Sequence, residues 1–103
     1  MSKIKVTVIK RINPDDIFEE GFMHPNGDRI KTCTAFNDGD EFIIENLNKP
    51  EKFCGWAWRD IFKDLSVLNF GGDFDWSQPG EAITCCTDGM RPVVFKLERM
   101  PKE

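Results

Sequence analysis

The fold is decided by the stretch AITCCTDGMRPVVFKLERM, residues 82–100. Its second half, VVFKLER at residues 93–99, alternates apolar and polar residues, which is the period-two pattern of a strand with one buried face. The Asp-Gly pair at residues 88–89 favours a two-residue hairpin turn, because both positions tolerate positive φ. Pro92 lacks a backbone N–H and restricts the residue before it, so a longer turn is the alternative. The stretch predicts a C-terminal β-hairpin.

Two adjacent cysteines, Cys85 and Cys86, stand on the first strand of this hairpin. A strict two-residue turn would place Phe95 opposite Ala82. Successive side chains of a strand point to opposite faces, so Cys86 should share the face of Phe95 while Cys85 lies on the other face. Only one of the two cysteines can therefore enter any given site.

Four further elements precede the hairpin. Residues 3–12 alternate as a strand, with a change of phase at residues 8–9 that suggests a bulge. Residues 13–21 resemble a short helix, with Asn13 as N-cap and acidic residues in the first turn. Residues 41–45 form a second strand. Apolar residues then recur every three or four positions, which predicts the main helix from about Pro50 or Gly55 to Leu65.

Together these elements predict an α+β fold in a single domain, residues 1–103. We expect a small, mostly antiparallel sheet of about four strands that includes the C-terminal hairpin. The main α-helix should pack against the inner face of the sheet, because its apolar stripe has no other partner in so short a chain. A short N-terminal helix completes the predicted architecture.

Composition and charge exclude several classes of function. The formal net charge is −4 and the 14 Lys and Arg residues are scattered, whereas nucleic-acid binders present a basic face, so we expect no nucleic-acid partner. No segment approaches the roughly 18 apolar residues of a membrane span, and no signal peptide is apparent. We expect a cytoplasmic protein with reduced thiols. No P-loop, dinucleotide-binding fingerprint or nucleophile elbow is present, which favours a binding or accessory module over an enzyme, with a small molecule or a protein as its partner.

Four cysteines and one histidine are the candidate metal ligands. A zinc or iron site could use Cys33, Cys54, one of Cys85 and Cys86, and His24. No Cys-x-x-Cys spacing occurs, so such a site would need assembly by the tertiary fold. An alternative is thiol chemistry at Cys54, whose thiolate the first turn of the main helix would stabilise. The remaining alternative is that all four cysteines are small buried residues.

The loop NFGGDFDWSQPG, residues 69–80, is rich in glycine yet carries large aromatic residues. It either folds back as a lid on the core, which we favour, or displays its aromatic side chains to a partner. In the second case Trp56, Phe74 and Trp76 would anchor a ligand together with Arg91. The alternative is that every tryptophan lies in the core.

Acidic residues provide a further hypothesis. Two carboxylates can divide acid and base roles when their environments separate their pKa values. Such a hydrolytic or cation site would use Asp73, Asp75 and Asp88, with Arg91 beside them. Turn formation explains the same residues without a site.

Three motifs carry a resemblance to a known family. They are FCGWAW at residues 53–58, FGGDFDW at residues 70–76 and CCTDGMRPVVFKLER at residues 85–99. With them the chain resembles, nearly end to end, a family of small uncharacterised proteins found largely in anaerobic bacteria and archaea. The resemblance implies a prokaryotic, cytoplasmic setting and supplies no catalytic residue.

Overall fold

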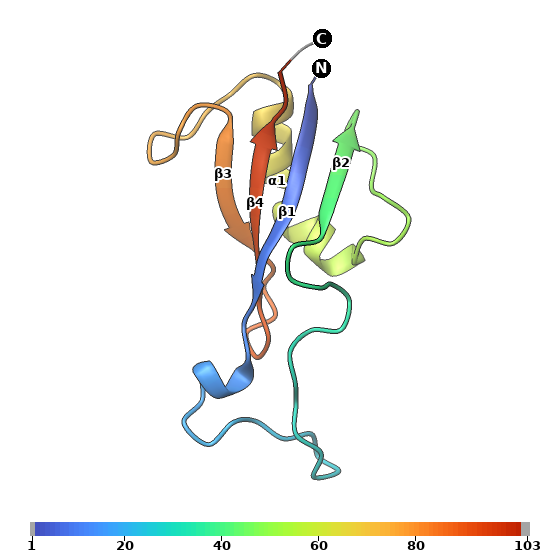
Figure 1. Cartoon of the computed structure of the whole chain (residues 1–103), viewed down its shortest axis with the longest axis vertical. Coiled ribbons are helices and arrows are strands. Elements are labelled where there is room, and N and C mark those ends of the chain that lie inside the picture. The colour runs from blue at the N-terminus through green and yellow to red at the C-terminus, as the bar shows by residue number, and fades with distance from the viewer. Residues whose placement is uncertain (1, 102–103) are drawn as a thin grey trace.

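A four-stranded antiparallel sheet and one long helix form the protein (Figure 1). The computed structural model describes residues 2–101. The strands are β1 (Lys3–Arg11), β2 (Glu41–Glu45), β3 (Glu81–Cys85) and β4 (Val93–Arg99), and they lie in the order β2-β1-β4-β3. The helix α1 (Gly55–Asn69) covers one face of the sheet. The predicted α+β fold is confirmed.

The C-terminal hairpin is formed by β3 and β4, but its turn is longer than two residues. Ala82 pairs with Leu97 rather than with Phe95, and the connecting loop covers residues 86–92. Pro92 explains the longer loop, because it has no N–H to donate to the strand ladder.

The pairing of β3 with β4 differs by two residues from the pairing that a two-residue turn would give. Because side chains alternate between the faces of a strand, a difference of two leaves every side chain on its predicted face. Cys86 is therefore buried on the face that it shares with Phe95, as expected. Cys85 is exposed on the other face together with Ile83. The predicted separation of the two cysteines is confirmed.

The N-terminal region agrees with the sequence in its strand and differs in its helix. The register of β1 against β4 shifts between Val8 and Lys10, which is the expected irregularity. The expected short helix is reduced to a 3-10 turn, η1 (Pro14–Asp16), with Asn13 as its cap. Ile17, the apolar residue directly after this turn, is 45% exposed and does not pack in the core. A helix this short does not persist without packing against the core.

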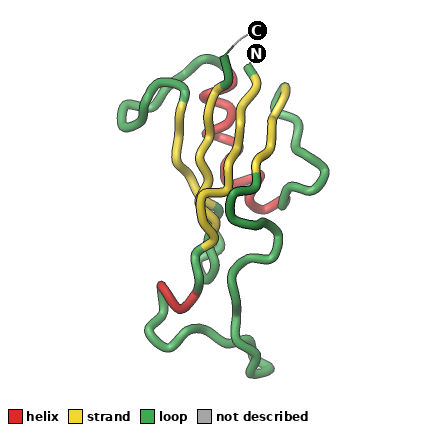
Figure 2. The backbone as a smooth tube through the Cα atoms, in the orientation of Figure 1, coloured by secondary structure: helices red, strands yellow, loops and turns green. Residues whose placement is uncertain are grey.

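The segment of residues 12–35, here called the arm, carries η1 and extends away from the sheet. Figure 2 shows it as loop apart from that one short turn. The molecule is elongated as a result, with extents of 51 × 30 × 20 Å.

The helix α1 starts at Gly55, one of the two predicted starts, and extends beyond Leu65 to Asn69. It ends in a Schellman motif. Gly71 N–H donates to the Leu68 carbonyl at 3.1 Å, and Gly72 N–H donates to the Val67 carbonyl at 2.8 Å. Gly71 has φ +87°, a left-handed conformation that glycine adopts without a steric penalty. The start of the FGGDFDW motif is therefore a helix stop signal.

The core lies between α1 and the sheet. β1 contributes Ile4, Val6 and Val8, which are all at most 1% exposed. The helix contributes Ala57, Ile61, Leu65 and Leu68. Within residues 2–101, no helix has the length and apolar character that crossing a bilayer requires.

Candidate functional site

A cavity of about 780 Å³ lies at the N-terminal end of α1, between the helix, the 86–92 loop and the chain at the end of the arm. Three of the four cysteines, Cys33, Cys54 and Cys86, line it, and we call it the thiol cavity. Its other lining residues with a polar, charged or large side chain are Phe36, Trp56, Arg59, Asp60, Thr87, Asp88, Met90 and Arg91. Segments far apart in the sequence thus meet at one end of the helix.

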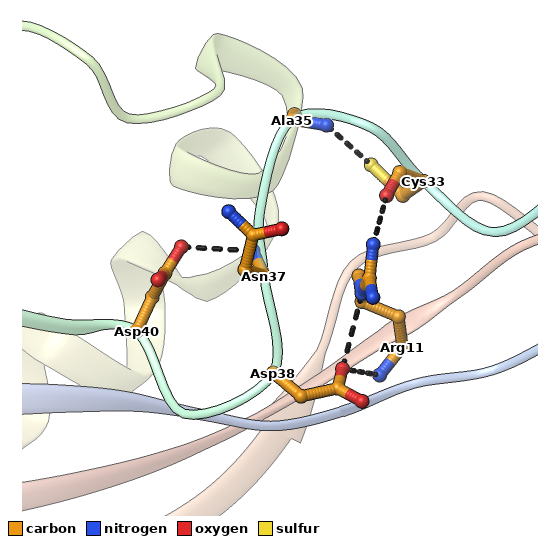
Figure 3. A network of polar contacts seen from close by, with 6 residues as sticks. All are labelled: Arg11, Cys33, Ala35, Asn37, Asp38 and Asp40. Carbon is orange, nitrogen blue, oxygen red and sulfur yellow. Dashed lines mark hydrogen bonds and ion pairs between the residues drawn. The ribbon is translucent and has the colours of Figure 1, made fainter.

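Arg11 on β1 holds Cys33 in place, as Figure 3 shows. Its backbone N–H and its Nε donate to Asp38 Oδ1 at 2.9 and 3.1 Å, and its Nη1 donates to the Cys33 carbonyl at 3.2 Å. The backbone hydrogen bond from Arg11, followed by the side-chain one, holds the pKa of the Asp38 carboxyl below its ordinary value. The Cys33 sulfur accepts a hydrogen bond from Ala35 N–H at 3.4 Å.

The other two thiols of the cavity have different surroundings. Cys86 is 9% exposed, and its sulfur accepts a hydrogen bond from Val93 N–H at 3.2 Å. Burial raises the pKa of the Cys86 thiol, which opposes thiolate formation there. Cys54 is half-buried and is the N-cap of α1. The sequence predicted that it would lie in the first turn of the helix, and it lies one position before that turn. Its side chain makes no capping hydrogen bond.

The structure brings together part of the predicted metal set. Cys85 is exposed on the opposite face of the sheet, and His24 is exposed in a turn of the arm. Neither lines the thiol cavity. Among residues 2–101, no three His, Cys, Asp or Glu side chains are grouped as a metal ion would require. Cys33, Cys54 and Cys86 share a cavity, but their sulfur atoms are not arranged as a ligand set.

Most charged groups of the thiol cavity already have partners. Asp60 Oδ2 accepts hydrogen bonds from Thr87 N–H and Oγ1 at 2.8 and 2.9 Å. Asp88 Oδ2 accepts from Arg91 Nε at 3.0 Å, and the same carboxylate accepts from Met90 N–H. Burial alone would raise the pKa of Asp88, but the hydrogen bonds from Arg91 and Met90 hold it below its ordinary value. Arg59 is exposed and forms no ion pair with the part of the chain described.

The four predicted binding residues fall into two groups. Trp56 and Arg91 line the thiol cavity, and Trp56 is 80% exposed. Phe74 and Trp76 belong to the loop before β3, where their ring centroids are 5.2 Å apart. Phe74 packs against the core, whereas Trp76 is 79% exposed. The favoured prediction of a lid is therefore wrong for Trp76, and so is the alternative that every tryptophan lies in the core.

The predicted acidic cluster is not assembled. Asp73 precedes β3 and Asp88 follows it, so they lie at opposite ends of that strand. Asp73 Oδ1 accepts hydrogen bonds from Gly80 N–H at 2.7 Å and from Arg99 Nη2 at 2.9 Å. These two hydrogen bonds, the backbone one first, hold the pKa of Asp73 below its ordinary value. Asp73 closes the loop before β3 onto the C-terminal strand, which is a structural role.

No protein-family model, curated protein or solved structure matches the chain. The argument for function therefore depends on the geometry of the site. Sequence reasoning missed Arg59 and the contact between Asp60 and Thr87. The available signal was the position of Arg59 and Asp60 on the helix, one turn after Trp56.

Proposed function

We propose that the protein is a binding module whose ligand occupies the thiol cavity. The observation that carries this proposal is Trp56, a large aromatic side chain that is 80% exposed and lines a cavity of about 780 Å³. Exposed aromatic side chains beside a concave surface are typical of binding sites, because the ligand gains apolar contact there. The stability of the fold does not explain why a tryptophan stands at this position, since an indole so exposed contributes little to the core.

The charges of the cavity favour a ligand with a negative group. Arg59 is free of ion pairs with the described residues, whereas Asp60 and Asp88 are engaged by hydrogen bonds. The first turn of α1 holds no acidic residue, and Cys54 does not cap it. The helix dipole therefore adds to the positive potential of Arg59. We infer a small molecule that combines an aromatic or apolar part, packed on Trp56, with a carboxylate, phosphate or sulfonate near Arg59.

The dye anilinonaphthalene sulfonate tests this proposal, because it has an aromatic part and one sulfonate. We expect saturable binding that Trp56→Ala abolishes and Arg59→Gln weakens several-fold. Trp76→Ala is the matched control, since its indole is equally exposed, at 79%, but lies outside the cavity. Equal loss of binding in Trp56→Ala and Trp76→Ala would refute the assignment, as would unsaturable binding. Circular dichroism of each variant shows that the fold is intact.

A second candidate is a soft-metal site, and the shared cavity of Cys33, Cys54 and Cys86 favours it. Thiolates bind zinc and iron strongly. The ion would have to draw the three sulfur atoms together, because they are not grouped as ligands in the described chain. Four unpaired cysteines also support our proposal of a cytoplasmic setting, where thiols stay reduced.

Metal analysis of protein purified anaerobically without added metal tests the second candidate. We expect about one zinc or iron per chain, lost in Cys86→Ser and retained in the control Cys85→Ser. Far less than one metal per chain, or full retention in Cys86→Ser, would eliminate this function.

A further inference from the structure

The arm carries a tight turn with the sequence FEEGF, residues 18–22, which we call the acidic turn. Gly21 N–H donates to the Phe18 carbonyl at 2.9 Å, so Glu19 and Glu20 occupy the two central positions of a β-turn. Both glutamates are exposed. Gly21 has φ +73°, which glycine adopts without strain. The turn therefore has a defined conformation that displays two carboxylates.

The acidic turn also exposes aromatic surface. The rings of Phe18 and Phe22 have their centroids 5.0 Å apart, and Phe22 is 41% exposed. Glu19 and Glu20 form no ion pair with any residue in the described range 2–101. Exposed apolar groups that lie together are typical of interaction surfaces. The fold thus leaves an aromatic pair and two free carboxylates side by side in the chain.

The thiol cavity has the complementary chemistry. The exposed indole of Trp56 lines it, and so does Arg59, which forms no ion pair with the part of the chain described. The N-terminal end of the helix dipole adds positive potential at the same place. An aromatic group packed on Trp56 with a carboxylate near Arg59 suits this cavity, and the acidic turn carries both groups.

The acidic turn does not fill the cavity of its own chain. Among residues 2–101, Cys33 is the one arm residue that lines the thiol cavity, and it lies near the far end of the arm from the turn. Figures 1 and 2 show that the arm projects from one end of the sheet. The turn is therefore presented to another molecule.

We propose that the acidic turn of one copy docks in the thiol cavity of a second copy, so that the chain forms a two-fold dimer. This inference rests on the proposed function, because it assigns a further occupant to the same cavity. Phe22 packs on Trp56, and a glutamate of the turn pairs with Arg59. Each copy gives one turn and receives one, so the contact is made twice and the assembly closes.

Sedimentation equilibrium of the full chain over a concentration series tests the dimer. We expect a dissociation constant below about 1 mM. Phe22→Ala should weaken dimerisation at least about tenfold, because truncating a central aromatic contact has the largest effect on an interface. Trp76→Ala is the control and should leave the dimer unchanged, since its exposed indole lies outside the turn and the cavity. A monomer at every concentration up to about 1 mM overturns the proposal, as does a dimer that Phe22→Ala leaves unchanged.

Mixing two variants tests the reciprocal contact directly. Phe22→Ala keeps an intact cavity, and Trp56→Ala keeps an intact turn. Each alone should dimerise poorly, whereas their mixture should form a heterodimer through one intact contact. Circular dichroism shows that both variants are folded. A mixture that associates no more strongly than either variant alone overturns the proposal.

Anilinonaphthalene sulfonate separates this inference from the proposed function. Phe22→Ala should bind the dye at least as tightly as the wild type, because its cavity is intact and no turn competes for it. Saturable dye binding by a wild type that stays monomeric overturns the dimer alone. Loss of saturable binding in monomeric Phe22→Ala overturns the proposed function instead, since nothing then occupies the cavity in place of the dye.

Discussion

Replacing Asn69 by leucine should stabilise the protein. The side-chain amide is buried, with both polar atoms unpartnered. Leaving a buried donor or acceptor unsatisfied costs about 1–3 kcal/mol. Leucine has nearly the same branched shape as asparagine, so it fills the same buried space. We therefore expect the free energy of unfolding of Asn69→Leu to rise by about 1–3 kcal/mol.

Urea unfolding followed by far-UV circular dichroism measures this change. An unchanged m value would show that the free energy of unfolding has changed and that the surface exposed on unfolding has not. The midpoint of thermal unfolding should rise by about 4 °C or more, since about 1 kcal/mol shifts a domain of this size by 4–8 °C. Asn48→Leu is the control, because Asn48 is exposed, and it should change stability by less than about 0.5 kcal/mol.

A loss of stability in Asn69→Leu of about 1 kcal/mol or more would refute the reasoning, since it would mean that the amide is hydrogen-bonded in solution. A change no larger than that of Asn48→Leu would refute it as well.

Three other predictions concern the loops and thiols. Gly71→Ala should lower the free energy of unfolding by about 1–2 kcal/mol, because residue 71 has positive φ. Gly89→Ala should leave the free energy of unfolding unchanged, since its added Cβ would meet open space. Urea unfolding of both variants measures the two changes. The depressed pKa of Asp73 gives stability that is present above its unfolded pKa and is lost as the pH falls through its folded pKa. Asp73→Asn should therefore lose less stability than the wild type when acidified below about pH 4, and equal losses in acid denaturation would contradict this. Iodoacetamide should modify exposed Cys85 before buried Cys86, as mass spectrometry of brief reactions can show, and the reverse order would be inconsistent with the structure.

The elements of the fold followed from local patterns in the sequence. Period-two alternation located β1, β2 and β4, and the spacing of apolar residues located α1. The prediction of a short helix within residues 13–21 was wrong, because its caps are local signals whereas its stability needed packing of its apolar side chains on the core. The predicted register of the hairpin was wrong, because the register depends on the loop conformation. The predicted face of each side chain was nevertheless correct, because the register differs from the prediction by two residues.

The candidate sites were less accessible to sequence reasoning, because tertiary contacts assemble them. Cys33 lies at the thiol cavity on a loop whose backbone accepts a hydrogen bond from Arg11, 22 positions away in the chain. The division between Trp56, which is exposed, and Trp58, which packs on the core, depends on where the helix faces the sheet. The burial of Asn69 gave no signal at all, since a polar residue at a helix end before two glycines is usually solvated.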